Sequence, residues 1–301
     1  MSPLLHKRPA VALTRILVFL LSMPLMLAQP GCRTQSSYNP IAEDYPLNIT
    51  GMANGTFASI FVVREIAESL LPEGLGFLDA AYNREYELYR DGYIPLLVRA
   101  LYVHDIRAPD DMWRPPYSLI SFEFPFVDAL HDGKTPFRYV YAQFIRTGTP
   151  NYAMDVARRY RVPHIVPSVF EPECDAYGPY PHALKGIPVD WRGQSVVVTA
   201  PMQVTREGRP FGRENMKNIV SSPRFNIGED GQMFCGRTKV FWGTSVMEEE
   251  TSGQVNVTGS FEFLHKLIKG GREMWDNQVY GIRTGSPFVD DDFVDCSSLA
   301  V

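Results

Sequence analysis

Three polar side chains lie in stretches that predict β-strands, and each has a type that could take part in chemistry. His164 could act as a general acid or base because its ordinary pKa is near neutrality; the simpler interpretation is a structural histidine. Glu123 lies between Phe122 and Phe124 and projects to the opposite face of their strand. If that face lined an interior, burial would raise the pKa of Glu123 and make it an acid; on the surface it would be an ordinary glutamate. Arg146 ends a strand, where its guanidinium could bind a substrate carboxylate or remain an exposed charge.

The stretch 139–166 positions two of these residues. Residues 139–146 alternate so that both faces of a strand would be at least half apolar. Thr149 and Pro150 are typical of the start of a helix, and apolar residues then recur at three- and four-residue spacing. Residues 161–166 predict a second strand. The unit is therefore a strand, a short helix and a strand.

Most of the remaining apolar runs also predict strands. The clearest is 117–127, where aromatic and apolar residues alternate with the residues of the opposite face. Two further short helices are predicted over 60–71 and 260–268, the first ended by Pro72. The other predicted strands are 96–106, 195–200, 202–206, 224–227, 238–246 and 254–258, while 171–188 predicts a long loop. The pattern shows no internal repeat and predicts a single mainly β domain over 57–285, an antiparallel barrel or sandwich.

Residues 1–28 have the layout of a secretory signal peptide. Basic residues precede an apolar run over 16–27, and Ala28 is a small residue at a candidate cleavage position. The run is shorter than the roughly 20 apolar residues that a spanning helix needs, so we expect cleavage and no stable membrane span. An uncleaved anchor is the alternative. The mature chain is expected in the lumen of the secretory pathway or outside the cell.

The flanking stretches and the cysteines agree with that compartment. Residues 29–56 are rich in Ser, Asn, Pro and Gly and predict an exposed leader, and the acidic stretch 286–301 predicts a solvated tail. Asn-x-Ser/Thr triplets without proline mark three expected glycosylation sites, Asn48, Asn54 and Asn256. An even number of cysteines in an oxidising compartment predicts disulfides, whose connectivity the sequence leaves open. The cysteines are Cys32, Cys174, Cys235 and Cys296.

Charge and motifs argue against several classes of function. The net charge is −5 at pH 7, and no long run of Lys and Arg occurs, so nucleic-acid binding is not expected. No Cys-x-x-Cys, His-x-His or His-Glu-x-x-His spacing occurs, so no metal site is predicted. A phosphate loop, a dinucleotide fingerprint and a Gly-x-Ser-x-Gly elbow are also missing, so no cofactor is expected. The expected partner is a small molecule.

Several segments in order carry a resemblance to a known family. Residues 64–75, Arg-Glu-Ile-Ala-Glu-Ser-Leu-Leu-Pro-Glu-Gly-Leu, form a helix-like stretch and a Leu-Leu-Pro-x-Gly-Leu turn. The strands at 97–103 and 117–126 follow, and then the strand, turn and proline-containing segment of 139–164. Over roughly residues 57–205 this order resembles the acetoacetate decarboxylase-like superfamily. The resemblance implies a β-barrel of about this size.

The resemblance also implies a specific chemistry, and the sequence departs from it. In the catalytic members a lysine after the proline forms an imine with a β-keto acid. Here the corresponding segment is Val-Pro-His-Ile at 162–165, and a histidine cannot form that imine. Lys239 lies in a strand-like run on the same face as Phe241 and is the replacement candidate; the alternative is a lysine that reaches to solvent.

These observations predict a lyase- or cyclase-type enzyme that acts on a small carboxylated, polyketide-like metabolite. In that hypothesis Arg146 orients the acid, while His164 and Glu123 handle the proton. One alternative is a non-catalytic barrel that carries a small apolar ligand between Tyr139, Tyr141 and phenylalanine side chains. Another is a secreted interaction protein that contacts its partner through the aromatic loop 177–181.

Overall fold

The structure is a computed structural model that describes most of the chain after residue 37. The described residues are 38–81, 92–148, 151–176, 183–190, 193–199, 212–244, 246–258, 261–264, 267 and 279–300. All of them belong to one compact unit, which spans 34–301. No helix in the described ranges is long and apolar enough to cross a membrane.

The described chain is mainly β, as the sequence predicts. Its strands are β1 (Ile49–Val63), β2 (Tyr93–Arg107), β3 (Trp113–Arg114), β4 (Tyr117–Val127), β5 (Phe137–Arg146), β6 (His164–Glu171), β7 (Ala183–Pro188), β8 (Ser195–Thr199), β9 (Arg224–Ile227), β10 (Met233–Val240), β11 (Val246–Thr258) and β12 (Val279–Val294). Its helices are α2 (Arg64–Ser69), α4 (Tyr152–Arg159), α5 (Arg213–Ser221) and the 3-10 helix η1 (Cys296–Leu299).

Two closed circuits of strands share five members. Strands β12, β1, β2, β4 and β5 lie side by side. From β5 one circuit returns to β12 through β6, β7, β8 and β11, and the other returns through β9 and β10. The two circuits divide the long end strands: β12 pairs with β11 through its first half and with β10 through its second.

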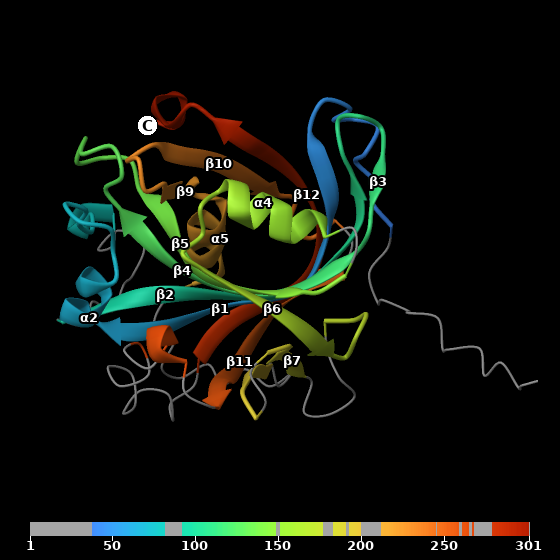
Figure 1. Cartoon of the computed structure of the whole chain (residues 1–301). Helices are drawn as coiled ribbons and strands as arrows, with labels where there is room; N and C mark the ends of the chain where they lie inside the picture. Colours follow the sequence, from blue (N-terminus) through green and yellow to red (C-terminus); the bar gives the residue numbers. More distant parts are fainter. Residues whose placement is uncertain are drawn as a thin grey trace, which may run out of the picture. The chain divides into compact units, whose positions relative to one another are not determined.

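The two circuits lie on opposite sides of the shared strands (Figure 1). We call the side that carries β9, β10, α4 and α5 the upper lobe, and the side that carries β7 and β11 the lower lobe. The sheet is mixed rather than purely antiparallel, because β5 pairs in parallel with both β6 and β9. The β5–β6 pair is joined by α4, as a parallel connection requires a crossover.

The shared strands are buried on both faces, and alternate residues supply two different cores. Phe122 and Phe124 of β4 pack with Phe144 in the lower lobe. In the upper lobe, Leu101 packs with Ile219 of α5. A strand covered on both faces needs apolar residues at almost every position, which explains the continuous apolar runs of β2 and β4. A charged residue in such a run must therefore point into a lobe.

Both flanking segments that the sequence predicts to be exposed are different in the structure. The leader was expected to extend to residue 56, but β1 begins at Ile49 and Met52 is fully buried. The solvated tail was expected from residue 286, but β12 continues to Val294 and Ser286 is fully buried. Both segments are drawn into the sheet because β1 and β12 pair with each other along their lengths.

Helices α2 and α4 begin later than the sequence predicts, whereas residues 262–264 and 267 of the predicted 260–268 helix are helical. α2 covers only part of the predicted 60–71 helix, since its first residues continue β1. α4 begins after Asn151, whose side chain accepts a hydrogen bond from Met154 N at 3.1 Å, so Asn151 is the N-cap. The predicted cap, Thr149, the predicted strand 202–206 and the loop 177–181 lie outside the described residues.

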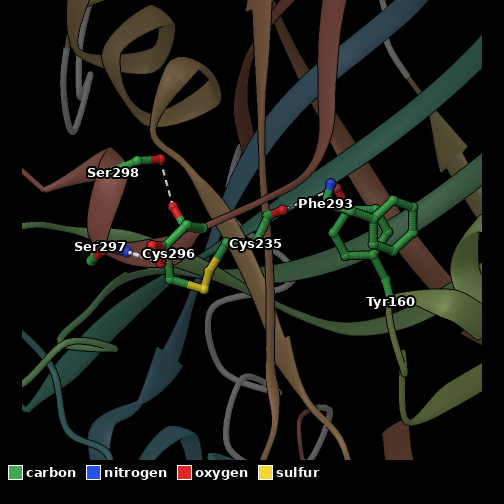
Figure 2. The surroundings of a disulfide bond; sticks show 7 residues. Tyr160, Cys235, Phe293, Cys296, Ser297 and Ser298 are labelled. Atoms are coloured by element: carbon green, nitrogen blue, oxygen red, sulfur yellow. Dashed lines mark hydrogen bonds between the residues drawn. A yellow bond between two sulfur atoms is a disulfide. The ribbon is translucent and has the colours of Figure 1, made fainter.

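A disulfide joins β10 to the C-terminal 3-10 helix. Cys235 and Cys296 are bonded with their Cα atoms 5.2 Å apart. Figure 2 shows this bond beside β10, with the stacked rings of Tyr160 and Phe293 on the other side of the strand. Cys174 is disulfide-bonded as well, and Cys32 lies outside the described residues.

Candidate functional site

The upper lobe contains a cavity of about 100 Å³. Most of its wall is apolar and comes from the shared strands, with Phe57, Leu101 and Ile145 among the contributors. α4 covers the cavity because it turns Ala153, Val156 and their neighbours inward, while its charged residues face outward. An apolar cavity that carries a few polar groups at one end is the usual form of a small-molecule site.

A buried ionic group built on β2, β4 and β5 stands at the polar end of this cavity. Glu123 is fully buried, and its Oε1 lies 2.6 Å from Arg99 Nε. Its Oε2 accepts a hydrogen bond from Arg138 Nη1. Ser121 Oγ donates to Glu123 Oε1 at 2.7 Å, and Arg138 Nε donates to the carbonyl of Ser222 at 3.0 Å. Arg99 lines the cavity, whereas Glu123 and Arg138 lie behind it.

Burial and neighbouring charges have opposite effects on the pKa values of Glu123 and Arg138. Burial alone would raise the pKa of Glu123, but Arg99 and Arg138, helped by Ser121, outweigh it and hold that pKa below its ordinary value. Burial lowers the pKa of Arg138 to about 10, although Glu123 opposes the shift. Glu123 and Arg138 are therefore both charged at neutral pH.

A second polar group lies on the same cavity wall. Arg224 Nη2 lies 2.9 Å from Asp290 Oδ1, and Arg224 Nη1 donates to Thr238 Oγ1 at 2.6 Å. Thr238 in turn donates to Asp290 Oδ1 at 3.2 Å, and Arg224 Nη2 reaches the Tyr160 hydroxyl at 3.2 Å. β9, β10, β12 and the end of α4 supply these four residues. They present a carboxylate and a phenol to the cavity.

The first of these groups carries more positive than negative charge. Among the described residues, two guanidinium groups, Arg99 and Arg138, face the single carboxylate of Glu123. Arg138 Nη2 is buried and has no hydrogen-bond partner among the described residues. The hydrogen bonds that Arg99 makes with described residues use its Nε, so its Nη groups remain available. An uncompensated buried cation is costly, and an anion in the cavity would relieve that cost.

Of the residues that the sequence proposes for chemistry, Glu123 belongs to this site and His164 does not. The pKa of Glu123 is lowered where burial was expected to raise it, because two arginines bind its carboxylate. His164 lies in the lower lobe, stacked on Phe263 with ring centroids 4.3 Å apart and edge-on to Tyr141. Burial lowers the pKa of His164.

Arg146 and Lys239 also lie outside the cavity wall. Arg146 lines a separate outer pocket, and its Nη2 pairs with Glu173 Oε1 at 2.6 Å. Lys239 is exposed, and its Nζ lies 4.8 Å from the centre of the Phe241 ring. The structure therefore does not bring Glu123, His164, Arg146 and Lys239 together. The described residues that line the cavity include neither a lysine nor a histidine.

The tyrosines proposed for a carrier pocket are not among the described residues of the cavity wall. Tyr141 is buried beside Phe124 and Phe263, and Tyr139 is buried beside Phe225 of β9. The Tyr141 hydroxyl donates to the carbonyl of Phe263 at 2.8 Å, and burial raises the pKa of Tyr139 to about 12. The pairing of β4 with β5 shifts register at this point, so the side chains of β5 do not alternate strictly between the two faces of the sheet.

The sequence reasoning missed the arginines and Asp290. Their signal is a charged residue within a run that must be buried on both faces: Arg99 follows Leu-Leu-Val, and Arg138 follows Phe137 in an aromatic strand. Asp290 carried no such signal, because it belongs to an acidic stretch that resembles a solvated end. No group of three or more His, Cys, Asp or Glu in the described part of the chain could hold a metal ion.

The expected glycosylation sites differ in exposure. Asn256 is exposed on β11. Asn48 is half-buried and donates to Asp291 Oδ1 at 2.6 Å. Asn54 is only 5% exposed, inside β1, where a glycan has no room. Glycosylation remains a prediction for Asn256 and Asn48, whereas the burial of Asn54 argues against a glycan there.

Comparison with known proteins finds similar solved structures but no similar sequence family. No family model matches the chain, and no curated protein matches it either. The enduracididine biosynthesis enzyme MppR, solved with the condensation product of pyruvate and imidazole 4-carboxaldehyde, is 11% identical, with a TM-score of 0.45 over 83% of this chain and 88% of that one.

An acetoacetate decarboxylase-like enzyme from Sphingomonas wittichii RW1 is 12% identical, with a TM-score of 0.41 over 81% of this chain and 91% of that one. The name of this second structure is the family that the sequence resembles. Both TM-scores are below 0.5 and both identities are below 25%, so these likenesses carry no conclusion about the activity of this chain.

Proposed function

We propose that the chain binds a small carboxylic acid with an apolar body in the upper-lobe cavity. We further propose that it acts on this acid as a lyase- or cyclase-type enzyme of the secretory pathway, with a polyketide-like metabolite as substrate. The observation that carries the proposal is the excess of buried positive charge at the polar end of an apolar cavity.

The binding step follows from the donors at that end. The Nη groups of Arg99 can donate two parallel hydrogen bonds to a carboxylate, the geometry in which arginine binds carboxylates most strongly. The cavity of about 100 Å³ is somewhat smaller than an engineered apolar cavity of about 150 Å³ that holds benzene. The fitting ligand is therefore a short-chain or compact acid.

The chemical step would use the second polar group. Asp290 lines the cavity as a carboxylate held by Arg224, so it is placed to accept a proton from carbon. Tyr160 contributes a hydroxyl to the same wall. The guanidinium groups would stabilise the negative charge that develops in the substrate. An imine route has no support in the described wall, because Lys239 is exposed outside it.

The N-terminal sequence and the Cys235–Cys296 disulfide support the secretory pathway, since disulfides persist in oxidising compartments. A carrier without chemistry is the second candidate, favoured by the almost continuous apolar wall. The enzyme and the carrier differ in their need for Asp290. If the chain is an enzyme, the Asp290→Asn variant should still bind the acid but lose turnover. If the chain is a carrier, the unmodified protein should release its natural ligand unaltered on unfolding. Mass spectrometry of the secreted protein under native and then denaturing conditions would identify that ligand.

The binding proposal is tested by fluorine NMR with 4,4,4-trifluorobutyrate and its neutral analogue 4,4,4-trifluorobutanol. We expect the acid to bind at least about tenfold more tightly than the alcohol, because a charge-assisted pair with arginine contributes about 1.5–3 kcal/mol. Arg99→Gln should remove this preference and Arg99→Lys should restore part of it, while binding of the alcohol shows that the cavity is intact. Equal affinities for acid and alcohol in the unmodified protein would refute the proposal.

A further inference from the structure

The cavity shares part of its wall with a second pocket at the surface. This outer pocket has a volume of about 240 Å³ and lies between the residues before β4 and the start of α4. Tyr117, Tyr152 and Ala153 line both the outer pocket and the cavity. Among the described residues, two aromatic side chains and a methyl group therefore stand between the cavity and the outer pocket.

Charge makes the outer pocket attractive to an anion. Arg146 is the charged residue among the described residues that line it. The partner of Arg146, Glu173, has a side chain that is 73% exposed, and such surface pairs are weak enough to exchange with a ligand. The guanidinium carbon of Arg114 lies 5.7 Å from the centre of the Tyr152 ring. Arg114 Nη2 pairs with Asp110 Oδ2, while its buried Nε has no hydrogen-bond partner among the described residues.

The opposite end of α4 offers a less suitable path. The open pocket there is lined by two arginines, Arg158 and Arg161, and by two acids, Glu229 and Asp230. Its charges balance, so it gives an anion no net attraction. Val162 lines both this pocket and the cavity. Tyr160 and Arg224, which also line the cavity, are hydrogen-bonded to each other.

We propose that small carboxylates reach the cavity through the outer pocket, with Arg146 as an outer binding site and Tyr117 and Tyr152 as the gate. This inference rests on the proposed function of the cavity. It also gives Arg146 a role that differs from holding the acid during chemistry: Arg146 captures the anion, and Arg99 binds it inside. Such a residue acts mainly on the association rate.

The role of the Arg146 charge in capturing the anion is tested with the variant Arg146→Gln. Association and dissociation rates are measured from the fluorine NMR line shapes of 4,4,4-trifluorobutyrate. We expect the association rate to fall by about fivefold and to lose most of its dependence on salt, with the dissociation rate nearly unchanged. Arg158→Gln is the matched control, since it removes one arginine from the pocket at the other end of α4. This control should leave both rates as they are.

The path itself is tested by filling the outer pocket. Gly148 lines this pocket, and a Cβ atom added to it meets no atom within 4 Å, so Gly148→Trp should fold normally. The bulky ring should slow association and dissociation together by about tenfold or more while the affinity changes far less, because both directions use the same gate. Arg158→Trp, which places the same ring in the other pocket, should change neither rate.

The outcomes separate this inference from the proposed function. In one outcome, trifluorobutyrate binds, and its rates change in the Arg158 variants but not in Arg146→Gln or Gly148→Trp. This result would overturn the access route, while the proposed binding site would remain supported. Binding with rates that respond to neither set would do the same. A folded protein that binds no trifluorobutyrate at all would overturn both.

Discussion

Glu123 holds together the polar end of the cavity, because two arginines depend on it for their counter-charge. Its carboxylate contacts Arg99 and Arg138, and Arg138 is fully buried. We expect Glu123→Gln to lower the free energy of unfolding by about 3–5 kcal/mol, since removing one partner leaves buried charges uncompensated. Urea denaturation measures this loss.

The control for that change is Glu171→Gln, which breaks the exposed pair of Glu171 with Lys185 at 3.3 Å. A surface pair of this kind contributes about 0–1 kcal/mol. If Glu123→Gln cost no more than this control, the buried group would not be the ionic network that the distances indicate.

His164 should make stability depend on pH near neutrality. Burial lowers its folded-state pKa below the ordinary value of 6.5, so the unfolded chain binds the proton first as pH falls. The stability contribution is complete above pH 6.5 and is lost as pH falls from there toward the lowered folded-state pKa. His164→Phe, which can still stack on Phe263, should flatten the unfolding free energy between about pH 5 and pH 7.

The matched change is His131→Phe, which replaces an exposed histidine. The slopes of unfolding free energy against pH are compared between this variant and His164→Phe. An unchanged slope in His164→Phe would show that His164 is not the group responsible.

For single residues, the sequence could mark the polar positions within the strands but not the residues that they contact. Glu123 was singled out because it interrupts an aromatic strand, and it does lie in the site. The direction of its pKa shift depends on Arg99 and Arg138, which reach it from two other strands. His164 was chosen for its chemical type, and chemical type alone does not reveal in which lobe a residue lies.

Among the elements, the disulfide between β10 and η1 anchors the C-terminal end of β12. It links residues 61 positions apart. The variant Cys235→Ala/Cys296→Ala should lose about 4 kcal/mol of unfolding free energy in the chain-entropy model, because the unfolded chain gains the freedom of the open loop. Chemical denaturation of the two proteins gives this difference.

The control for the double-cysteine variant is a substitution in the 3-10 helix η1. Ser297→Ala changes an exposed residue of η1 without touching the bond, and we expect it to stay within about 0.5 kcal/mol of the unmodified protein. A double-cysteine variant as stable as Ser297→Ala would mean that η1 stays docked by packing alone.

Elements with strong local patterns were predictable, and elements fixed by distant partners were not. The strand predicted at 117–127 is β4 with the same bounds, because its alternation is complete within the segment. β1 looked like a polar leader because it contains Gly and Asn. Gly55 is needed there: its φ is +155°, and a Cβ atom would lie 2.1 Å from the carbonyl oxygen of Ala100.

β12 was missed for a related reason. Asp290 seemed to belong to a solvated end, whereas in the fold it pairs with Arg224, 66 positions earlier. No local pattern reports such a pairing. The same limit applies to α5, whose apolar face, with Met216 and Ile219, was not recognised in the sequence.

In the molecule as a whole, the two lobes share their long strands, and this predicts how they unfold. β1, β2, β4, β5 and β12 belong to both circuits, so neither lobe can lose them without opening the other. We therefore expect a single cooperative transition, although a domain of this size often shows intermediates. One substitution in each lobe tests the expectation.

Phe144→Ala empties part of the lower core, and Ile219→Ala empties part of the upper core. Both side chains are almost completely buried, so we expect losses of about 3–5 and 2–5 kcal/mol respectively. Circular dichroism and tryptophan fluorescence should report the same denaturation midpoint in each variant. Separate transitions for the two probes, with Phe144→Ala moving one and Ile219→Ala moving the other, would mean that the lobes are independent. The cavity could then open without disturbing the lower core, and the gate at Tyr117 and Tyr152 would not be needed for access.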